Sequence, residues 1–531
     1  MSGRSVQRQW STRYLEERLG VKGQTAGLVK KVLTQPGSPK PLTIRSQTKL
    51  RPKPKWLISR WLLVFLFPIG FLLTNSAYQN TAHYFSMTVI SAIACAILLI
   101  RLRFSLEITF PVWMILSVFG IGYYLKFYWM TWVLQSNAEW PFDPIFLGPA
   151  SSSTLMLRVY TITTLGFVAF CLVSWLLLGW RMSRELPKNK WWNENGKVIR
   201  SKIARLGVPL FSILALVMAI TAYVQYATGI AVAGAESVYL PFRLAGLIFY
   251  FRSITIPALL VLLIWLTEEY RLLKMHSIAI GLLILHGFIQ MLLASSRGAL
   301  LNMVLPVIFL WLLSARFTAG RRNLLIVLFL IVAWMHPVLS QYRQLRAAGD
   351  IYDIAHAFTE SIRSSGDIWT NLSRGIISII SRVTGTESLL FAAQMEDVSF
   401  TFENIRYYLF NPERSLARIY TQDVIGFGPS VMWHLSAPSL LGAFYLIGGD
   451  AGVIIGVTVW TLFWIWFWRV LRRLRWRSLP VAQSMILLLI FHFTSEGDID
   501  ALPLRGLIYG ASLLLCEFLA RRLMLLPPRV S

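Results

Sequence analysis

Several features that identify common classes of protein are scarce or missing in this chain of 531 residues. It has only three cysteines, and each lies inside an apolar run, so neither a disulfide nor a thiolate metal site is indicated. The sequence contains no Walker A motif, no HExxH motif and no GxSxG motif, which argues against ATP-driven transport and zinc chemistry. No cofactor or metal is therefore predicted. The first apolar run, Trp56 to Leu73, is followed by no cleavage pattern and is interpreted as a retained anchor.

Acidic residues are also scarce, with 25 Asp and Glu against 51 Lys and Arg, and the formal net charge is +26. The basic residues concentrate in 1–55, in 181–205 and in 469–477, which hold 13, eight and five of them. These segments alternate along the hydropathy pattern, as expected from the positive-inside bias of a multispanning protein. Membrane lipids are then the natural counterions, nucleic acid is not an expected partner, and both termini are predicted to be cytoplasmic.

Long apolar runs dominate what is present: 56% of the residues are hydrophobic and 14% are charged. The composition predicts an all-α polytopic integral membrane protein with about twelve transmembrane helices. The predicted spans are 56–74, 84–100, 108–126, 156–180, 206–225, 253–267, 277–294, 299–315, 323–340, 450–468, 480–495 and 501–520. The predicted parts are a basic, partly disordered tail (1–55), spans one to nine (56–340), an outer loop (341–449), spans ten to twelve (450–520) and a cytoplasmic C-terminus (521–531).

The segment from Gln341 to about Leu435 interrupts this pattern. It holds eight Arg, no Lys and ten Asp or Glu, whereas every other long polar segment is strongly basic. The charge bias places it outside, and short amphipathic helices are predicted at Ile351–Phe358 and Thr401–Tyr408. Residues 436–448, ahead of the break Gly448-Gly449-Asp450, are interpreted as a re-entrant or interfacial helix.

Arginines that could bind a phosphate occur at two places. Arg297 stands in the turn Ser295–Gly298, where an arginine at the start of a helix opposes the helix dipole and a bound anion would relieve the conflict. A snorkelling interfacial arginine is the alternative. The long segment supplies the others, because guanidinium groups bind diphosphates and carboxylates through paired hydrogen bonds. Pairing with the segment's own carboxylates is the alternative there. The candidates in it are Arg343, Arg346, Arg414 and Arg418.

A candidate for acid or base chemistry stands at the end of the long segment. His434 lies near a predicted outer interface, with Ser436 beside it as a substrate-binding candidate. Asp423 and Glu413 are carboxylate alternatives. Glu496, Asp498 and Asp500 form another acidic turn on the same side, for which a solvated turn is the simpler interpretation.

The SSRG turn, the late outer loop and the stretch HLSAPSLLGAFYLIGGDAGVIIG (434–456) together resemble the Wzy-type polymerases of O-antigen or oligosaccharide repeat units, over about 281–468. The resemblance implies a GT-C-like, metal-independent glycosyltransferase of the bacterial inner membrane, with a periplasmic loop between spans nine and ten. Its substrates would be undecaprenyl-diphosphate-linked oligosaccharides, and a chain-length regulator protein stays open as a partner. Arg297 and the arginines after the ninth span would hold the diphosphate, and the region of His434 would form the active centre. The basic N-terminal tail is not part of the family pattern.

Other functions remain open at the level of the sequence. An O-antigen ligase, which transfers glycan to the lipid A core, has a similar layout. A transporter or flippase would suit about twelve spans, although no internal repeat is visible. A structural scaffold of an envelope complex is the third alternative.

Overall fold

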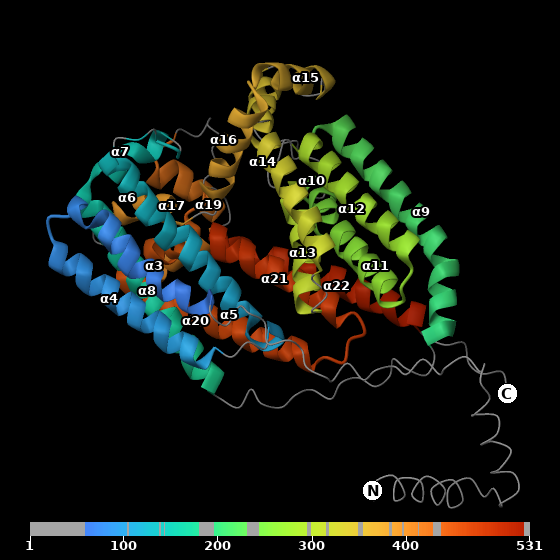
Figure 1. The fold of residues 1–531 in the computed structure, drawn as a ribbon, viewed down its shortest axis with the longest axis horizontal. Coiled ribbons are helices and arrows are strands. Elements are labelled where there is room, and N and C mark those ends of the chain that lie inside the picture. The colour runs from blue at the N-terminus through green and yellow to red at the C-terminus, as the bar shows by residue number, and fades with distance from the viewer. Residues whose placement is uncertain are drawn as a thin grey trace, which may run out of the picture. The chain divides into compact units, whose positions relative to one another are not determined.

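The computed structural model describes residues 59–102, 106–136, 138, 140–142, 144–179, 196–230, 244–294, 299–314, 318–348, 354–381, 385–395, 398–411, 414–427 and 437–524. The chain divides into two units, Met1–Leu57 and Ile58–Ser531, and all described residues belong to the second. Within the described residues every regular element is a helix (Figure 1). Ten stretches of them are long and apolar enough to cross a membrane, which indicates a multi-pass membrane protein.

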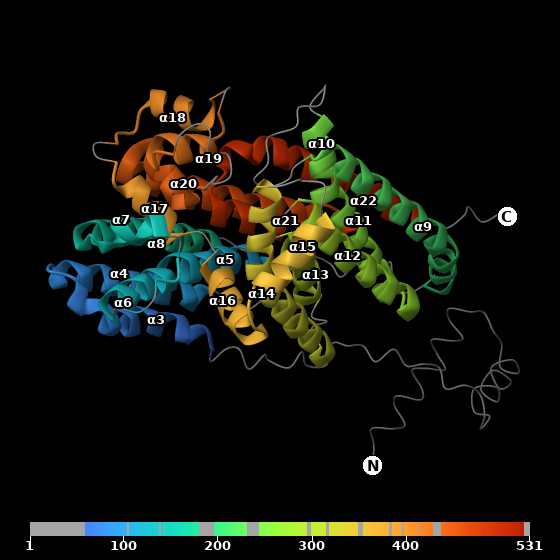
Figure 2. The ribbon, with the colours of Figure 1, turned by 90° about the horizontal axis from the view of Figure 1, so that it is seen from above.

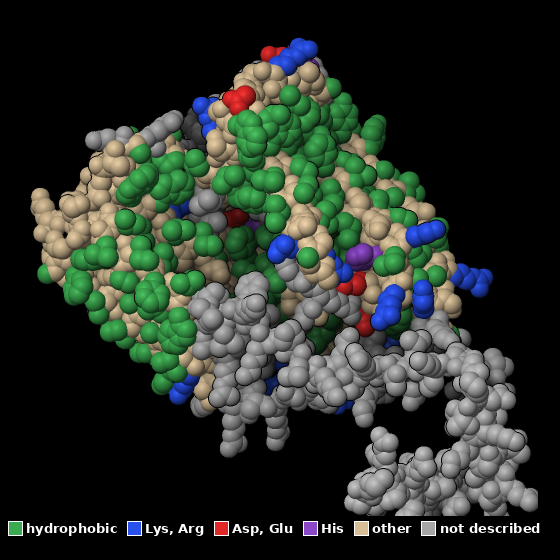
Figure 3. All heavy atoms as spheres, in the orientation of Figure 1, with side chains coloured by type: hydrophobic (Ala, Val, Ile, Leu, Met, Phe, Trp, Pro, Cys, Tyr) green, Lys and Arg blue, Asp and Glu red, His purple; other side chains and the backbone are tan. Residues whose placement is uncertain are grey.

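The longer part of the fold is made of apolar helices. In chain order they are α3 (Ser59–Thr74), α4 (Thr81–Arg101), α5 (Leu106–Val118), η3 (Phe119–Leu125), α6 (Lys126–Ser136), α8 (Ser153–Gly179), α9 (Gly196–Thr228), α10 (Leu244–Tyr250), η7 (Phe251–Thr255), α11 (Ile256–Glu269), α12 (Leu273–Leu293), α13 (Ala299–Leu313), α14 (Ala319–Ala348), α20 (Ser439–Arg473), α21 (Leu479–Glu496) and α22 (Leu502–Met524). Figure 3 shows hydrophobic side chains over much of one face, with few charged ones among them.

Short helices occupy the connections. They are η2 (Asn75–Ala77), η4 (Pro144–Phe146), α7 (Leu147–Ser151), α15 (Ile354–Ser364), α16 (Ile368–Ser381), α17 (Thr386–Ala393), α18 (Phe402–Leu409), α19 (Leu416–Ile419), η8 (Tyr420–Val424) and η9 (Ile499–Ala501). The long segment after the ninth predicted span is thus largely helical where it is described. It has helices at both places where amphipathic ones were predicted, and further helices between and after them.

Each of the twelve predicted spans overlaps one of these helices, but ten of the described helical stretches meet the length of a span. The remaining two apolar stretches, Trp61–Ala77 and Asn302–Leu313, are shorter, so the count of twelve stays a prediction. The ninth span is longer than predicted. Its helix α14 continues through Arg343 and Arg346 to Ala348, instead of ending at 340.

A hydrogen-bonded network of hydroxyl groups holds the first helices together inside the apolar core. The Tyr160 hydroxyl lies 3.0 Å from that of Tyr128 and 3.1 Å from that of Thr88, and all three side chains are buried. Ser91 and Tyr124 form a similar pair at 2.8 Å. Without water in a bilayer core, buried hydroxyls need such partners, so this network fixes how α4, α6 and α8 face one another.

Helices α15 and α16 both pack on α14, and Figure 1 shows α15 crossing the end of α14. Gly375 of α16 makes this possible, because a Cβ atom there would lie 1.7 Å from the backbone oxygen of Ala333. The Tyr342 hydroxyl donates to the backbone oxygen of Leu292 at 2.9 Å and joins the end of α14 to the end of α12. The described start of the long segment is therefore packed on the membrane helices.

Helix α20 is broken inside, at the place where the sequence predicted a break. Gly449 has a φ of 58° and a ψ of −145°, a conformation open essentially to glycine alone. A Cβ atom there would also lie 2.5 Å from the backbone oxygen of Val398. The break therefore lets the segment before α18 pack against α20, and it separates a ten-residue stretch, Ser439–Gly448, from the longer remainder of the helix.

Candidate active site

The predicted site residues fall into two groups. Arg297, His434 and Ser436 lie outside the described residues, and for Arg346 only the backbone, within α14, is described. The remaining ones, Arg343, Arg414, Arg418 and Asp423, have described side chains.

Arg414 and Asp423 are brought together with Tyr407 in a closed triad. Arg414 Nη1 lies 2.8 Å from Asp423 Oδ1, and Arg414 Nη2 donates to the Tyr407 hydroxyl at 2.9 Å. The Tyr407 hydroxyl in turn donates to Asp423 Oδ2. Burial and the Asp423 carboxylate raise the pKa of Tyr407, which keeps the phenol protonated as a donor. Both charged side chains are about one-third exposed, so the triad faces a region open to solvent.

This triad is attached to the turn between α21 and α22. The backbone N–H of Leu416, at the start of α19, donates to Asp500 Oδ2 at 3.0 Å. Ser415 caps α19 by accepting from the N–H of Arg418, and Arg418 itself is partly exposed. The connection brings the acidic turn of the sequence beside the arginines of the long segment, two features that are far apart along the chain.

The acidic turn is a charged network. Arg505 of α22 lies 3.3 Å from Asp498 Oδ2 and 3.7 Å from Glu496 Oε2. Glu496 is also 3.5 Å from His492 Nδ1, one helical turn earlier on α21. Ionisable groups at the ends of membrane helices cost free energy to desolvate, and groups in such places usually have a functional role. The acidic turn is therefore a candidate functional site.

Asp498 is the most perturbed of these groups outside the spans. Burial, and then the neighbouring Glu496, raise the pKa of Asp498 to about 7, and Arg505 only partly offsets them. Its Oδ1 atom is enclosed and has no hydrogen-bond partner among the described residues. A carboxyl group with a pKa near neutrality is suited to accept or donate a proton.

The backbone at the start of α20 is strained where it meets this turn. Ser439 is fully buried and has a φ of 64°, which is unusual for a residue other than glycine and costs about 1–3 kcal/mol. A Cβ atom at Gly497, whose own φ is 73°, would lie 2.2 Å from the backbone oxygen of Ser439. The described chain resumes at Ala437, so the residues that follow Ser436 in the sequence lie against the turn that carries Asp498.

Arg343 lies elsewhere on the same fold. It is half-buried on α14, next to Tyr342, whose hydroxyl contacts Leu292. Leu292 lies at the end of α12, so the part of α14 that carries Arg343 is held at that end. The helices packed most closely on α14 are α16 and α15.

Arg158 was not predicted as a site residue, yet it lines two adjoining open clefts. Their volumes are about 320 and about 830 Å³, and Arg158 and Thr154 of α8 border both. The smaller cleft is also lined by Asn80, His83 and Asp450, whose amide, imidazole and carboxylate groups supply both hydrogen-bond donors and acceptors. Arg158 Nη2 donates to the Tyr445 hydroxyl at 2.6 Å.

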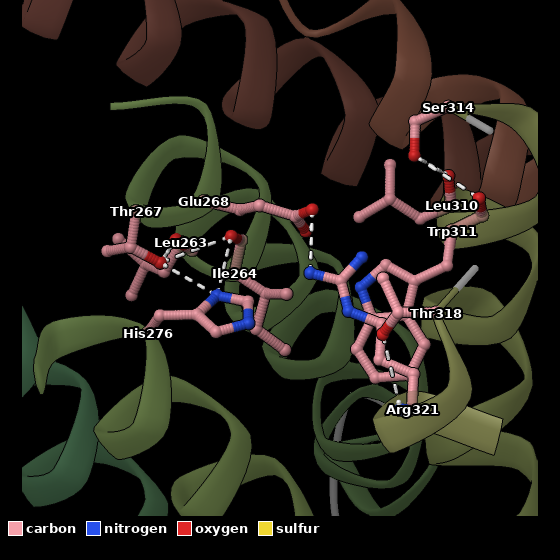
Figure 4. Close-up of polar contacts among 10 residues, drawn as sticks. All are labelled: Leu263, Ile264, Thr267, Glu268, His276, Leu310, Trp311, Ser314, Thr318 and Arg321. Atoms are coloured by element: carbon pink, nitrogen blue, oxygen red, sulfur yellow. Dashed lines mark hydrogen bonds and ion pairs between the residues drawn. The ribbon is translucent and has the colours of Figure 1, made fainter. Parts of the chain in front are cut away.

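A separate polar cluster lies where α11 and α13 end and where α12 and α14 begin (Figure 4). Arg321 lies 2.8 Å from Glu268 Oε1, with its Cζ atom 4.7 Å from the centre of the Trp311 ring. His276 Nδ1 lies 3.3 Å from the backbone oxygen of Ile264. Arg321 pairs with Glu268 and His276 bonds to α11, so we assign the cluster a structural role at the side predicted to be cytoplasmic.

Sequence reasoning thus missed Arg158 and Arg505, and it undervalued Asp498. Arg505 carried a detectable signal, because it follows the acidic turn and lies near the start of an apolar run. Arg158 carried none beyond being a charge near a span end. Comparison with protein-family models, with curated proteins and with solved structures finds no match for this chain.

Proposed function

We propose that the chain is a polysaccharide polymerase that joins undecaprenyl-diphosphate-linked oligosaccharide repeat units on the periplasmic side of the bacterial inner membrane. The observation that carries the proposal is the attachment of the Arg414–Asp423 pair to the turn of Asp498. Arg414 pairs with a carboxylate of its own segment, which was the alternative to phosphate binding, and its segment is joined to the turn that carries Asp498. The proposal is that Arg414 exchanges this partner for a diphosphate and that the Asp498 carboxyl group takes part in proton transfer. Transfer of a lipid-linked glycan needs both groups.

The chemistry follows from the leaving group. A hydroxyl oxygen of the acceptor sugar attacks the anomeric carbon of the donor glycan, and the bond from that carbon to the diphosphate oxygen breaks. The hydroxyl proton passes to a carboxylate, and undecaprenyl diphosphate leaves. Because the diphosphate is already a good leaving group, stabilising its charge with arginines should contribute more than protonating it.

The contacts favour a division of roles between the two aspartates. Asp423 is held by Arg414 and Tyr407, so it positions the arginine, whereas Asp498 has a pKa near neutrality and an unpartnered Oδ1 among the described atoms. We therefore assign the role of base to Asp498 ahead of Asp423, with His434 as the alternative that the sequence supports. The polar cleft at Arg158 and Asp450 is the candidate acceptor subsite.

The test is reconstitution of the purified chain with lipid-linked repeat units, followed by the size of the product on a gel. Polymer formation should fall about tenfold or more in Arg414→Gln and about 100-fold in Asp498→Asn, as expected for the loss of charge stabilisation and of a general base. Matched controls are Arg363→Gln and Glu360→Gln, an exposed and loosely paired arginine and carboxylate of α15. Polymer of normal length from both site variants would contradict the assignment.

The ligase alternative is separated in cells. A deletion strain whose lipopolysaccharide carries single repeat units supports the polymerase, and unused long polymer on the carrier lipid supports the ligase. Loss of both polymer and transfer, with lipid-linked repeat units trapped on the cytoplasmic side of the membrane, would instead indicate a flippase.

A further inference from the structure

Arg252 is a fully buried arginine that the proposed reaction does not use. It lies in η7, and its Nη1 donates to Gln225 Oε1 of α9 and, at 3.4 Å, to the backbone oxygen of Thr221. Among the described residues its Nε and Nη2 atoms have no hydrogen-bond partner. A buried guanidinium with two idle donors in a membrane helix is costly, so a partner is expected.

The idle atoms define the chemistry of that partner. The N–H groups of Nε and Nη2 point from one edge of the guanidinium, the edge that binds two oxygens of a phosphate or carboxylate. Gln225 Nε2 is also buried without a partner among the described residues, and it adds a third donor. The edge of Arg252 formed by Nε and Nη2, together with Gln225 Nε2, therefore suits the binding of an oxyanion.

The position of these groups along the helices favours a lipid as the source of the anion. Arg252 is the eighth residue of the stretch Ala245–Glu269, about 10 Å from its predicted outer end at 1.5 Å per residue. Gln225 lies three residues before the end of α9, at the same side. This depth is close to the headgroup region of a bilayer, where lipid phosphates lie.

The helices that carry the site form a wall exposed to lipid. Helices α9, α10 and α12 lie together at one side of the described unit (Figures 1 and 2). Tyr223 and Leu247 are 70% and 60% exposed, although Gln225 and Arg252 beside them are buried. His286 Nε2 of α12 lies 2.9 Å from the backbone oxygen of Arg252 and fixes the back of the site.

We propose that Arg252 and Gln225 bind the phosphate of a phospholipid of the outer leaflet. The site is separate from the catalytic one and does not depend on the polymerase assignment. The Arg252 site is connected to the candidate active site, because Tyr250, on the opposite face of the same helix, interacts with Arg505 of the acidic turn. Lipid binding at Arg252 would stabilise the helix that supports this turn.

The test measures the thermal stability of the delipidated full chain in detergent during titration with dioleoylphosphatidylglycerol. Dioleoylglycerol has the same acyl chains without the phosphate, and inorganic phosphate supplies the anion without the chains. We expect stabilisation by the phospholipid alone. Equal stabilisation by dioleoylglycerol or by inorganic phosphate would overturn a site for a lipid phosphate.

Substitutions at Arg252 test whether the phospholipid binds at this residue. Arg252→Gln should raise the phospholipid concentration for half-maximal stabilisation by about tenfold or more, since charge-assisted paired hydrogen bonds are lost. Arg252→Lys keeps the charge but not the paired donors and should lose most of the affinity, which covers the case that Arg252→Gln does not fold. Arg321→Gln, at the other ends of the helices, should respond like the parent. An unchanged response in both Arg252 variants would refute the proposal.

An internal carboxylate is the competing partner. Glu236 is the acidic residue that precedes Arg252 most closely in the sequence, and it lies outside the described residues. The proposal expects Glu236→Gln to keep the phospholipid response of the parent. Loss of the response in this variant, to the same extent as in Arg252→Gln, would assign the idle edge of Arg252 to Glu236 instead.

Discussion

The ion pair between Lys126 and Glu387 joins the long segment to the membrane helices, and its removal is a direct test of how that segment is held. The side chains are 1% and 7% exposed, and Lys126 Nζ donates to Glu387 Oε1. Thr386, next to Glu387, donates to the backbone oxygen of Tyr123 at 2.7 Å. Helix α17 is therefore fixed on η3 and α6 by buried polar contacts.

Lys126→Met removes one partner and leaves the other buried. An uncompensated buried charge costs about 3–5 kcal/mol, whereas replacing both partners by groups of similar volume is often neutral. Lys126→Met should thus lower the free energy of unfolding by about 3–5 kcal/mol, seen as a loss of about 3–5 °C in thermal midpoint for a chain of 531 residues. The double variant Lys126→Met, Glu387→Gln should recover most of that loss.

The loss of stability in Lys126→Met should also depend on pH, in a direction set by the pKa of Glu387. Burial raises the pKa of Glu387, and the Lys126 ammonium lowers it in partial compensation. Without Lys126 the folded state binds a proton at a higher pH than the unfolded state does, so stability falls as the pH rises from the unfolded pKa through the folded one. The defect of Lys126→Met should therefore be smaller at pH 5 than at pH 8. Equal midpoints for parent and Lys126→Met, or no recovery in the double variant, would refute the reasoning.

Two further predictions concern the candidate site. With a pKa of about 7, Asp498 as base predicts that polymer formation rises with pH through neutrality, and that the residual activity of Asp498→Asn lacks this rise in a pH–rate profile. Gly449→Ala places a Cβ atom 2.5 Å from the backbone oxygen of Val398 at a φ of 58°, and should cost at least about 2 kcal/mol. Thermal midpoints would measure that cost, with Gly281→Ala as control, since a Cβ atom there meets nothing within 4 Å.

The sequence predicted the helices of the membrane part because a span must satisfy its own backbone and be apolar over about 20 residues. That requirement is local, so each predicted run overlaps a helix. The ends were predicted less well. Helix α14 continues past Ser340 because its polar last turns carry amphipathic side chains and no helix-breaking residue before Gly349, which hydropathy alone does not register.

The candidate site could be predicted only in part, because its geometry depends on contacts between distant segments and not on local sequence. Arg414 and Asp423 are nine positions apart, and the type of residue was enough to select both. Asp498 owes its raised pKa to burial and to Glu496, and its turn is joined to the segment of Arg414 by the contact between Asp500 and Leu416. These effects depend on packing between distant segments, so a single sequence gives no direct sign of them.

Close contacts between backbone segments, more than ion pairs, bring the parts of the candidate site together. Gly449 admits the chain at Val398, Gly497 admits the start of α20 at Ser439, and Ser439 itself has a strained φ. A strained residue persists only where its surroundings determine its conformation, and such residues cluster at functional sites. A loop that merely covered the membrane helices would need neither the break in α20 nor this contact with the acidic turn. The cost of that geometry therefore makes the start of α20, where Ser439 meets the turn of Asp498, a candidate functional site.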